Sequence, residues 1–462
     1  MNGSDGVLPV PDTNNSIAPQ APKTTRRRWP YGVIGFLLLL VASIAVVLTN
    51  AMIEIPPPTG PAAVGFRTTT LVDPSRVMVV HGRRTARVVT LDIWYPAANT
   101  QGRLPEPYQD AALAALLAKY QGIPDVAGSA PSYAFNGAPL QPGKYPVVVF
   151  NHGYGSFTKQ NFANFQELAS HGYLVVSLGH PQESLMARDR RGGVIEFNPS
   201  ATEYVDFLKS QQHAALTAVA LTAALTQQRA ARTRAEHHSA SLALARQQPF
   251  VGLRHLLSNW VLDTRLVIAA LAHVPGADPT RVTLMGHSAG GVVALEIAKS
   301  PPSGVRGVIN LDGPWVSYDD GARELQLPLL AFLSTHNLLE GHDVGMHGTF
   351  DAALNAGSQP AYVIEIAGTA HNNFTDLGFV RLLKYISSVL GPADGMAVYR
   401  WQNAATLTFL HGLETGALPA QLLAADPALH QRRLPKHITL THADPQASAA
   451  PAQPTAVSSS AR

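Results

Sequence analysis

Short apolar runs alternate along the chain with longer segments in which apolar residues recur every three or four positions. The apolar runs are rich in Val, Ile and Leu and are typical of buried strands. They lie at residues 67–72, 86–94, 146–151, 173–178, 281–285, 307–311, 328–333 and 361–366. Helical spacing is found at residues 161–171, 255–273, 292–300, 350–355 and 379–390.

This alternation predicts an α/β fold. Strands that are apolar throughout are buried on both faces, so the pattern indicates a mostly parallel sheet with helices on both sides. We expect the first two strands to be antiparallel and to precede the parallel strands along the chain.

The interval between the strands at 173–178 and 281–285 is too long for a single crossover helix. It contains an Ala- and Gln-rich stretch before the helical segment that starts at His255. We interpret residues 201–250 as a helical insertion or lid. Its apolar part, residues 214–225, either packs on other helices, which is the commoner arrangement, or contacts lipid.

An uncharged stretch of 19 residues, 31–49, follows a run of three arginines at 26–28. As a helix it would be about 28 Å long, close to the ~30 Å hydrocarbon core of a bilayer. Trp29 lies where an aromatic belt would be. The sequence therefore predicts a transmembrane signal anchor over residues 29–52. A cleaved signal peptide, whose apolar core is usually shorter, and a buried core helix are the alternatives.

Basic residues are concentrated before this stretch, and only Arg67 follows it within about 20 residues. The positive-inside rule then places residues 1–28 in the cytoplasm, as a disordered tail, and the body of the protein outside it, in a periplasmic or extracellular space. Residues 53–64 contain three consecutive prolines and are expected to form a stalk. The folded domain is then residues 65–430, and residues 431–462 form a second disordered tail.

Composition and charge exclude several classes of protein. The chain has 462 residues, of which 46% are hydrophobic and 14% charged, so it is not disordered throughout. The net charge is +3, but residues 1–28 carry +2 and residues 430–462 carry +3, which leaves the middle slightly acidic. A basic face for nucleic acid is therefore not indicated. Because the chain has no cysteine, disulfides and thiolate catalysis are excluded.

The motif GHSAG at residues 286–290 follows one predicted strand and precedes a predicted helix. In this strand–turn–helix context, G-x-S-x-G is typical of a nucleophilic serine, here Ser288, raised on a sharp turn. The N-terminus of the following helix would favour negative charge on the reacting oxygen. The alternative is a glycine-rich turn with an incidental serine.

A serine hydroxyl needs a neighbouring base to become an effective nucleophile. His371 is the candidate base because it directly follows the last predicted strand. Asp312 ends the strand after the nucleophile and is our preferred orienting carboxylate. Glu340 and Asp343, one strand later, are the alternatives.

When the serine attacks, negative charge develops on the substrate oxygen. Two backbone N–H groups, which form an oxyanion hole, are needed to stabilise it. One belongs to the residue after the nucleophile, Ala289. The other should come from the loop after the strand at 146–151, where we favour Tyr154 over Gly153.

Two further patterns have ordinary explanations. His342, Asp343 and His347 resemble a metal-binding cluster but lie in a glycine-rich loop without a fourth ligand, so we interpret them as solvated. We expect no metal and no organic cofactor. A glycosylation sequon begins at Asn373, but a glycan there would block His371.

Five segments together resemble the plasma-type platelet-activating-factor acetylhydrolase family of α/β-hydrolases. They are YPVVVFNHGYG, LASHGYLVVSLGHP, GHSAGG, INLDGPW and GTAHNNFTD, and their order and spacing are similar to that family's over about residues 65–390. The resemblance implies the α/β-hydrolase fold and a serine esterase activity. It also favours Asp312, because that family places its acid after the strand that follows the nucleophile.

Carried over position by position, the resemblance makes Ser288 the nucleophile, His371 the base and Asp312 its orienting acid. Tyr154 and Ala289 match the oxyanion-hole amides. Two departures, a small Ala289 and a longer spacing after Asp312, leave the shape of the acyl site open.

The sequence therefore predicts a membrane-anchored serine carboxylic-ester hydrolase that forms an acyl-enzyme on Ser288. Its substrate would be a small-molecule ester or lipid, with short acyl chains preferred, and its membrane contact would be through residues 31–49. The alternative is a catalytically inactive hydrolase fold that acts as a binding module outside the cytoplasm. The sequence leaves the oligomeric state and the physiological ester open.

Overall fold

The computed structural model describes most of the chain after residue 52. The described residues are 53–121, 132–198, 250–315, 325–336, 338–339, 342–343, 359–380 and 389–434, with isolated positions between 223 and 246 and at 350 and 383. The chain divides into two units, Met1–Thr49 and Asn50–Arg462, and all of these residues belong to the second.

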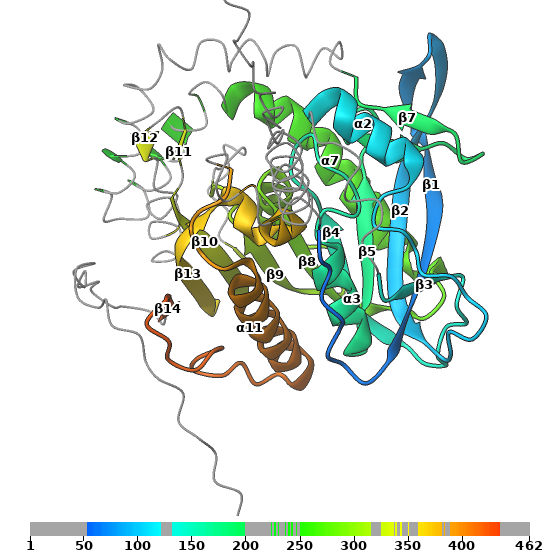
Figure 1. Cartoon of the computed structure of the whole chain (residues 1–462). Coiled ribbons are helices and arrows are strands. Elements are labelled where there is room, and N and C mark those ends of the chain that lie inside the picture. The colour runs from blue at the N-terminus through cyan, green and yellow to red at the C-terminus, as the bar shows by residue number, and fades with distance from the viewer. Residues whose placement is uncertain are drawn as a thin grey trace, which may run out of the picture. The chain divides into compact units, whose positions relative to one another are not determined.

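A ten-stranded sheet runs through the described part of the chain, in the order β14-β13-β10-β9-β8-β4-β5-β2-β1-β3 (Figure 1). Its strands are β1 (Ala63–Val80), β2 (Arg83–Ala97), β3 (Ala134–Asn136), β4 (Tyr145–Asn151), β5 (Leu174–Gly179), β8 (Ala277–His287), β9 (Val305–Leu311), β10 (Leu329–His336), β13 (Ala361–Ala370) and β14 (Leu429–Leu434). Two short two-stranded ladders, β6 (Met186–Arg188) with β7 (Val194–Glu196) and β11 (Leu338–Leu339) with β12 (His342–Asp343), lie apart from it.

The predicted mostly parallel sheet is confirmed. Neighbours from β5 through β4, β8, β9 and β10 to β13 pair in parallel. Strands β1 and β2 form a long antiparallel hairpin, and β2 joins β5 in the antiparallel sense, so the expected leading pair is also present. Each of the eight apolar runs corresponds to one of these strands.

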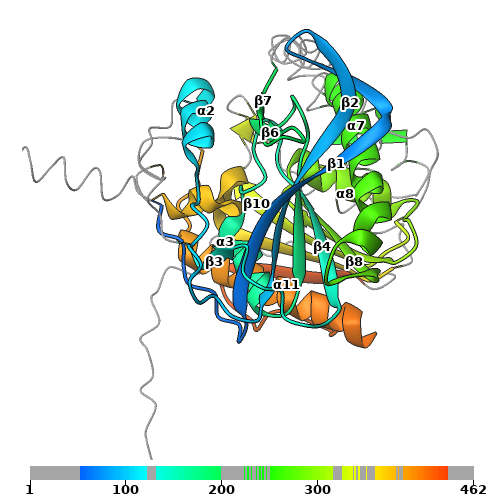
Figure 2. The same cartoon turned by 90° about the vertical axis from the view of Figure 1, so that its right-hand side faces the viewer.

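Helices cover both faces of the sheet, as Figure 2 shows. These are α3 (Phe162–Ser170), α7 (Phe250–Ala270), α8 (Ala289–Ala298) and α11 (Gly395–Thr415), whereas α2 (Ala111–Gln121) packs on Phe157 and Leu185 in a separate small cluster. Alternate residues of one strand serve the two faces. Val147 and Val149 of β4 pack with α7 and α8, whereas Val148 and Phe150 pack with α3 and α11. This two-sided burial explains why the strands are apolar throughout.

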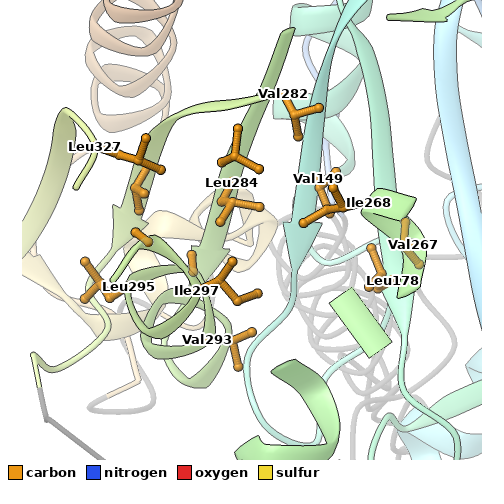
Figure 3. Packing of buried hydrophobic residues seen from close by; sticks show 14 of the residues in the cluster. Val149, Leu178, Val267, Ile268, Val282, Leu284, Val293, Leu295, Ile297 and Leu327 are labelled. Atoms are coloured by element: carbon orange, nitrogen blue, oxygen red, sulfur yellow. The ribbon is translucent and has the colours of Figure 1, made fainter. Parts of the chain in front are cut away.

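The packing between α7, α8 and the centre of the sheet fixes the position of α8. Val293 and Ile297 of α8 are fully buried beside strand residues such as Leu284 of β8 (Figure 3). Because α8 starts one residue after Ser288, this packing also fixes the turn that carries the serine.

Two predicted boundaries are wrong. Residues 53–64 do not form a free stalk: Ile53 and Ile55 are buried in the core, and Nε2 of Gln166 in α3 donates to the carbonyl of Pro56 at 2.7 Å. The apolar residues among the prolines find a hydrophobic surface on α3, which explains the docking. The boundary at 430 lies inside β14, which pairs with β13, so the folded domain continues to residue 434.

The helix α11 was not predicted, although its caps are visible in the sequence. The side chain of Asp394 accepts the N–H of Ala397, and Gly416 ends the helix at a φ of 71°. The predicted helices at 350–355 and 379–390 lie mostly outside the described residues.

The predicted transmembrane anchor at 29–52 lies outside the described residues, as do the tail at 1–28 and nearly all of the insertion at 201–250. Among the helices that are described, none combines the length and the apolar character needed to cross a bilayer. The crossover helix after the insertion is described and begins at Phe250, five residues before the predicted start.

Candidate active site

Ser288 occupies a strained turn between β8 and α8. Its φ is 54° and its ψ is −120°, a conformation that non-glycine residues rarely adopt. The turn is tight enough that a Cβ atom at Gly286 would lie 2.2 Å from the backbone of Gly290. A Cβ atom at Gly290 would lie 2.0 Å from the carbonyl oxygen of Asn151. The two motif glycines are therefore required by close backbone approach, and Ser288 is left half-exposed at the edge of the sheet.

Asp312 follows the neighbouring strand β9 and is brought next to this turn. The N–H of Ser288 donates to the carbonyl of Leu311 at 2.9 Å, so the residues before Asp312 and the serine turn are held together. Asp312 is itself at a φ of 54° and is completely buried.

The carboxylate of Asp312 is fully engaged. It accepts the N–H and the hydroxyl of Ser334, both at 2.8 Å, and its Oδ2 lies 2.7 Å from Nδ1 of His371. Burial alone would raise the pKa of Asp312. The hydrogen bonds from His371 and Ser334 outweigh burial and hold the pKa below its usual value, so the group is an anion at neutral pH.

His371 begins a short 3₁₀ turn, His371–Phe374, directly after β13. An ionised carboxylate can only accept, so Nδ1 of His371 carries the proton in this pair and Nε2 is left as the basic nitrogen. The side chain is 33% exposed, which leaves it accessible from the sheet edge. The structure thus joins the preferred acid and base. Of the two alternative acids, Glu340 lies outside the described residues, and only the backbone of Asp343 is described, in β12.

The loop after β4 lies directly against the serine turn. Its Gly153 N–H donates to Oε1 of Gln160 at 2.8 Å, so this amide already has a partner. The Gly153 amide is thus directed at Gln160, and Tyr154 stays our prediction for the first oxyanion-hole amide. Ala289 is our prediction for the second oxyanion-hole amide. It is the first residue of α8, and the N–H groups in the first turn of a helix have no acceptor within the helix.

His287, inside the G-x-S-x-G motif, was not singled out from the sequence. Its ring lies 4.5 Å from the ring of His371, and its Nε2 lies 3.1 Å from the His371 carbonyl oxygen, to which it donates. Burial, reinforced by repulsion from His371, lowers the pKa of His287 to about 3, so the ring is neutral. It holds the backbone of the candidate base. Its place next to the serine is the one sequence signal that could have identified it.

A buried cluster of charged residues beneath the β4 loop was also missed. The guanidinium of Arg87 binds both carboxylate oxygens of Asp263 at 2.8 Å and reaches Glu183 at 2.9 Å. Burial raises the pKa of Glu183 to about 7, and the Arg87 charge limits this rise. His180 donates from Nδ1 to Asp263 at 2.9 Å and stacks on Trp260. Since these residues come from β2, α7 and the loop after β5, no local pattern marks the cluster.

The structure places the glycosylation sequon at Asn373. Oδ1 of Asn373 accepts the N–H groups of Ala370 and Gly391, each at 2.8 Å, and the residue is buried. A glycan does not fit there. Within the described part of the chain, no group of three or more His, Asp or Glu side chains is arranged to hold a metal ion. The suspected cluster of His342, Asp343 and His347 is only partly covered, because His347 lies outside the described residues.

Comparison with known proteins assigns the chain to a family. The model of the family described as "Platelet-activating factor acetylhydrolase, isoform II" matches residues 47–416. Two relatives are named platelet-activating factor acetylhydrolase. The one from Canis lupus familiaris is 26% identical over 312 residues, covering 64% of this chain and 65% of that protein. The one from Cavia porcellus is 27% identical over 282 residues, covering 59% and 58%. The chain thus spans less than two thirds of either relative's length.

A solved structure shares the fold. A ferulic acid esterase from Streptomyces cinnamoneus is similar with a TM-score of 0.58 and 19% sequence identity, covering 78% of this chain and 92% of that one.

Proposed function

The chain belongs to the family of platelet-activating factor acetylhydrolase, isoform II, and on this premise we propose that it is a serine hydrolase of carboxylic esters. The observation that carries the proposal is the 2.7 Å contact between Asp312 and His371 at the same sheet edge as the Ser288 turn. A buried, ionised acid, a histidine that it orients and a serine on a strained turn are the three parts of a nucleophilic triad.

In the proposed reaction, Oγ of Ser288 attacks the ester carbonyl carbon while Nε2 of His371 takes the hydroxyl proton. The carbonyl oxygen becomes an oxyanion, bound by the N–H groups of Tyr154 and Ala289. The C–O bond to the alcohol then breaks, and the alcohol leaves with the proton from His371. A water molecule, deprotonated by His371, cleaves the acyl-Ser288 ester and releases the acid.

Asp312 has a defined part in these steps. Its negative charge stabilises the imidazolium that forms when His371 is protonated, and its hydrogen bond keeps Nε2 directed away from it. The mechanism calls on side chains and backbone amides of this chain, and no step requires a metal ion or an organic cofactor.

The test is labelling with a fluorophosphonate, which reacts with activated serines, followed by peptide mapping. We expect a single adduct on Ser288. The Ser288→Ala variant should not be labelled and should lose on the order of 10⁶ in kcat. If the folded wild-type protein is neither labelled nor active on esters, the chain is instead a non-catalytic binding module with this fold.

We extend the proposal to the acyl group, for which we expect acetyl to butyryl esters to be preferred. The loops that carry Tyr154 and His371 are rich in Gly, Asn and His rather than in long apolar side chains. Each extra methylene is worth only ~0.8 kcal/mol, so the preference should be graded. A series of p-nitrophenyl esters from two to sixteen carbons, with and without EDTA, measures it. A maximum of kcat/KM at ten or more carbons would contradict this preference.

We also propose that residues 31–49 anchor the enzyme in a membrane, with the N-terminus in the cytoplasm and the catalytic domain outside it. The support is the 19-residue uncharged stretch and the arginines before it. Sequencing of the mature N-terminus and protease accessibility of intact cells test this. A mature chain that begins near Met52 would exclude an uncleaved anchor, and a catalytic domain protected from external protease would exclude the orientation.

A further inference from the structure

His152 belongs to the same loop as Tyr154, and its side chain points toward the buried charged cluster, where it contacts Ser184. Its ring is completely buried, with Nδ1 2.6 Å from the carbonyl oxygen of Gly153 and Nε2 2.6 Å from the hydroxyl of Ser184. The ring also contacts Trp260 in a T-shaped arrangement, with ring centroids 5.0 Å apart. None of these contacts is used by the reaction steps above.

The two contacts determine where the proton of the ring lies. A carbonyl oxygen can only accept, so Nδ1–H of His152 donates to Gly153. Nε2 is then an acceptor, and the Ser184 hydroxyl donates to it. Burial, reinforced by the neighbouring His180, lowers the pKa of His152 to about 3, so the neutral ring with its proton on Nδ1 is the stable form at pH 7.

The carbonyl that His152 holds belongs to the same peptide unit as the N–H of Tyr154. In a planar trans peptide, the C=O and the N–H point in opposite directions. The Gly153 oxygen also accepts the N–H of Ser156 at 3.0 Å, and the preceding peptide is held by the bond from Gly153 N–H to Gln160. The direction of the Tyr154 N–H is therefore set by what binds the Gly153 oxygen on the other side of the peptide.

Ser184, which orients the ring, is fixed in turn. Its N–H donates to the carbonyl of His180 at 2.8 Å, and the ring of His180 is held by Asp263, which Arg87 binds at two atoms. The support for His152 is thus a buried and charge-compensated cluster, which has few alternative arrangements.

We propose that His152 is a positioning residue that aims the Tyr154 N–H into the oxyanion hole, by holding the Gly153 carbonyl from behind. The proposal rests on the esterase function proposed above. It predicts that loss of His152 weakens stabilisation of the oxyanion and leaves ground-state binding of the substrate unchanged.

The test compares p-nitrophenyl acetate with its thionoester, in which sulfur replaces the carbonyl oxygen. The sulfur anion that forms is larger and a weaker hydrogen-bond acceptor, so it gains less from the oxyanion hole. Loss of one oxyanion-hole donor costs about 10²–10³ in kcat. We expect His152→Leu to lower kcat on the ester by about 10²-fold, with KM unchanged, and to lower the thionoester rate far less.

Two variants separate the hydrogen bond from the bulk of the ring. His152→Asn places an amide donor near the Nδ1 position and should recover most of the ester rate. Ser184→Ala keeps the ring but removes its orienting donor, and should shift the ester-to-thionoester rate ratio in the same direction as His152→Leu, by a smaller factor.

Tyr95→Phe is the matched control. It removes a buried hydrogen bond to a backbone carbonyl, at 2.8 Å to Ala138, away from the site. It should leave the ratio unchanged.

The outcomes distinguish this proposal from the esterase assignment. A wild-type protein without activity on either substrate means that the proposed function itself is wrong. An active wild type, in which His152→Leu lowers both rates equally or His152→Asn is as impaired as His152→Leu, means that His152 has only a structural role. If His152→Leu does not fold, the ratios of His152→Asn and Ser184→Ala decide the question.

Discussion

Ser288 and Asp312 share an unusual positive backbone dihedral angle, with φ at 54° in both residues. Each directly follows one of two neighbouring parallel strands, β8 and β9, and the positive φ turns the chain sharply where the strand ends. Such conformations cost about 1–3 kcal/mol and persist where surrounding contacts fix them. Here the N–H of Ser288 donates to Leu311 and the N–H of Asp312 donates to Phe332 at 2.8 Å, so the sheet holds both turns.

We predict that Asp312→Asn lowers kcat by about 10⁴ while the protein still folds. The amide cannot stabilise the imidazolium of His371 and favours the wrong tautomer of the ring. Steady-state kinetics on p-nitrophenyl acetate measure the loss. Asp343→Asn is the control and should retain wild-type kinetics. The reverse result would place the orienting acid one strand later.

We predict that Gly290→Ala disables the enzyme. Its Cβ atom would lie 2.0 Å from the carbonyl oxygen of Asn151, so the loop that carries Tyr154 must move away from the serine turn. A misplacement of about 1 Å can cost 10²-fold in rate, and we expect at least about that loss in kcat/KM.

Gly192→Ala is a control at a position where an added Cβ meets no other atom. Gly192 has a φ of 82° with no heavy atom within 4 Å of an added Cβ, so the change tests backbone strain without a clash. It should cost about 1–2 kcal/mol of stability and leave kcat/KM unchanged. Equal effects of the two changes on activity would show that the close approach at Gly290 is unimportant.

We predict that Arg87→Ala destabilises the fold by about 3–5 kcal/mol, because it leaves Glu183 buried without its counter-charge and leaves buried Asp263 with only one of its two guanidinium partners, Arg76. Urea unfolding followed by circular dichroism measures the change. Lys119→Ala removes an ion pair with Glu196 in which both side chains are exposed, and should leave the midpoint unchanged. A small effect of Arg87→Ala would mean that Arg76 alone compensates the charge of Asp263, and would contradict the prediction.

We predict that stability rises with pH between about 3 and 6.5, in part because of His287. Its pKa is about 3 in the folded protein, against about 6.5 when unfolded, so the unfolded chain binds more protons in this window. The stabilisation is fully present above the unfolded pKa and is lost as the pH falls toward 3. His152, with a folded pKa of about 3, acts in the same direction.

His287→Asn tests this linkage. One proton contributes a slope of about 1.4 kcal/mol per pH unit to the free energy of unfolding, and the variant should lose about that slope between pH 4 and 6. Reading the slope separates the titration from any constant destabilisation that the substitution causes. Tyr95→Phe, which does not titrate in this range, should lower stability without a change in slope. An unchanged slope in His287→Asn would mean that the ring is protonated in the folded protein.

The sequence by itself determined eight of the ten strands of the central sheet and their mainly parallel arrangement, whereas β3 and β14 were not predicted. Their burial on both faces requires continuous apolar runs, and these are local features of the chain. The sharp turn at Ser288 and the position of His371 directly after β13 were also predictable, because the turn depends on glycines within two residues and the histidine adjoins an apolar run. The caps of α11, Asp394 and Gly416, were equally local and could have been recognised.

The tertiary structure alone decided the partners of these residues. It joined Asp312 to His371 across 59 residues, and it bound the Gly153 amide to Gln160. It also docked Ile55 on the core, where a stalk was expected, and assembled Arg87, Asp263 and Glu183 from separate elements. Each of these contacts depends on which strand ends and loops meet in space. Hydrogen bonds and ion pairs between distant segments leave no periodic pattern in either of the segments that form them.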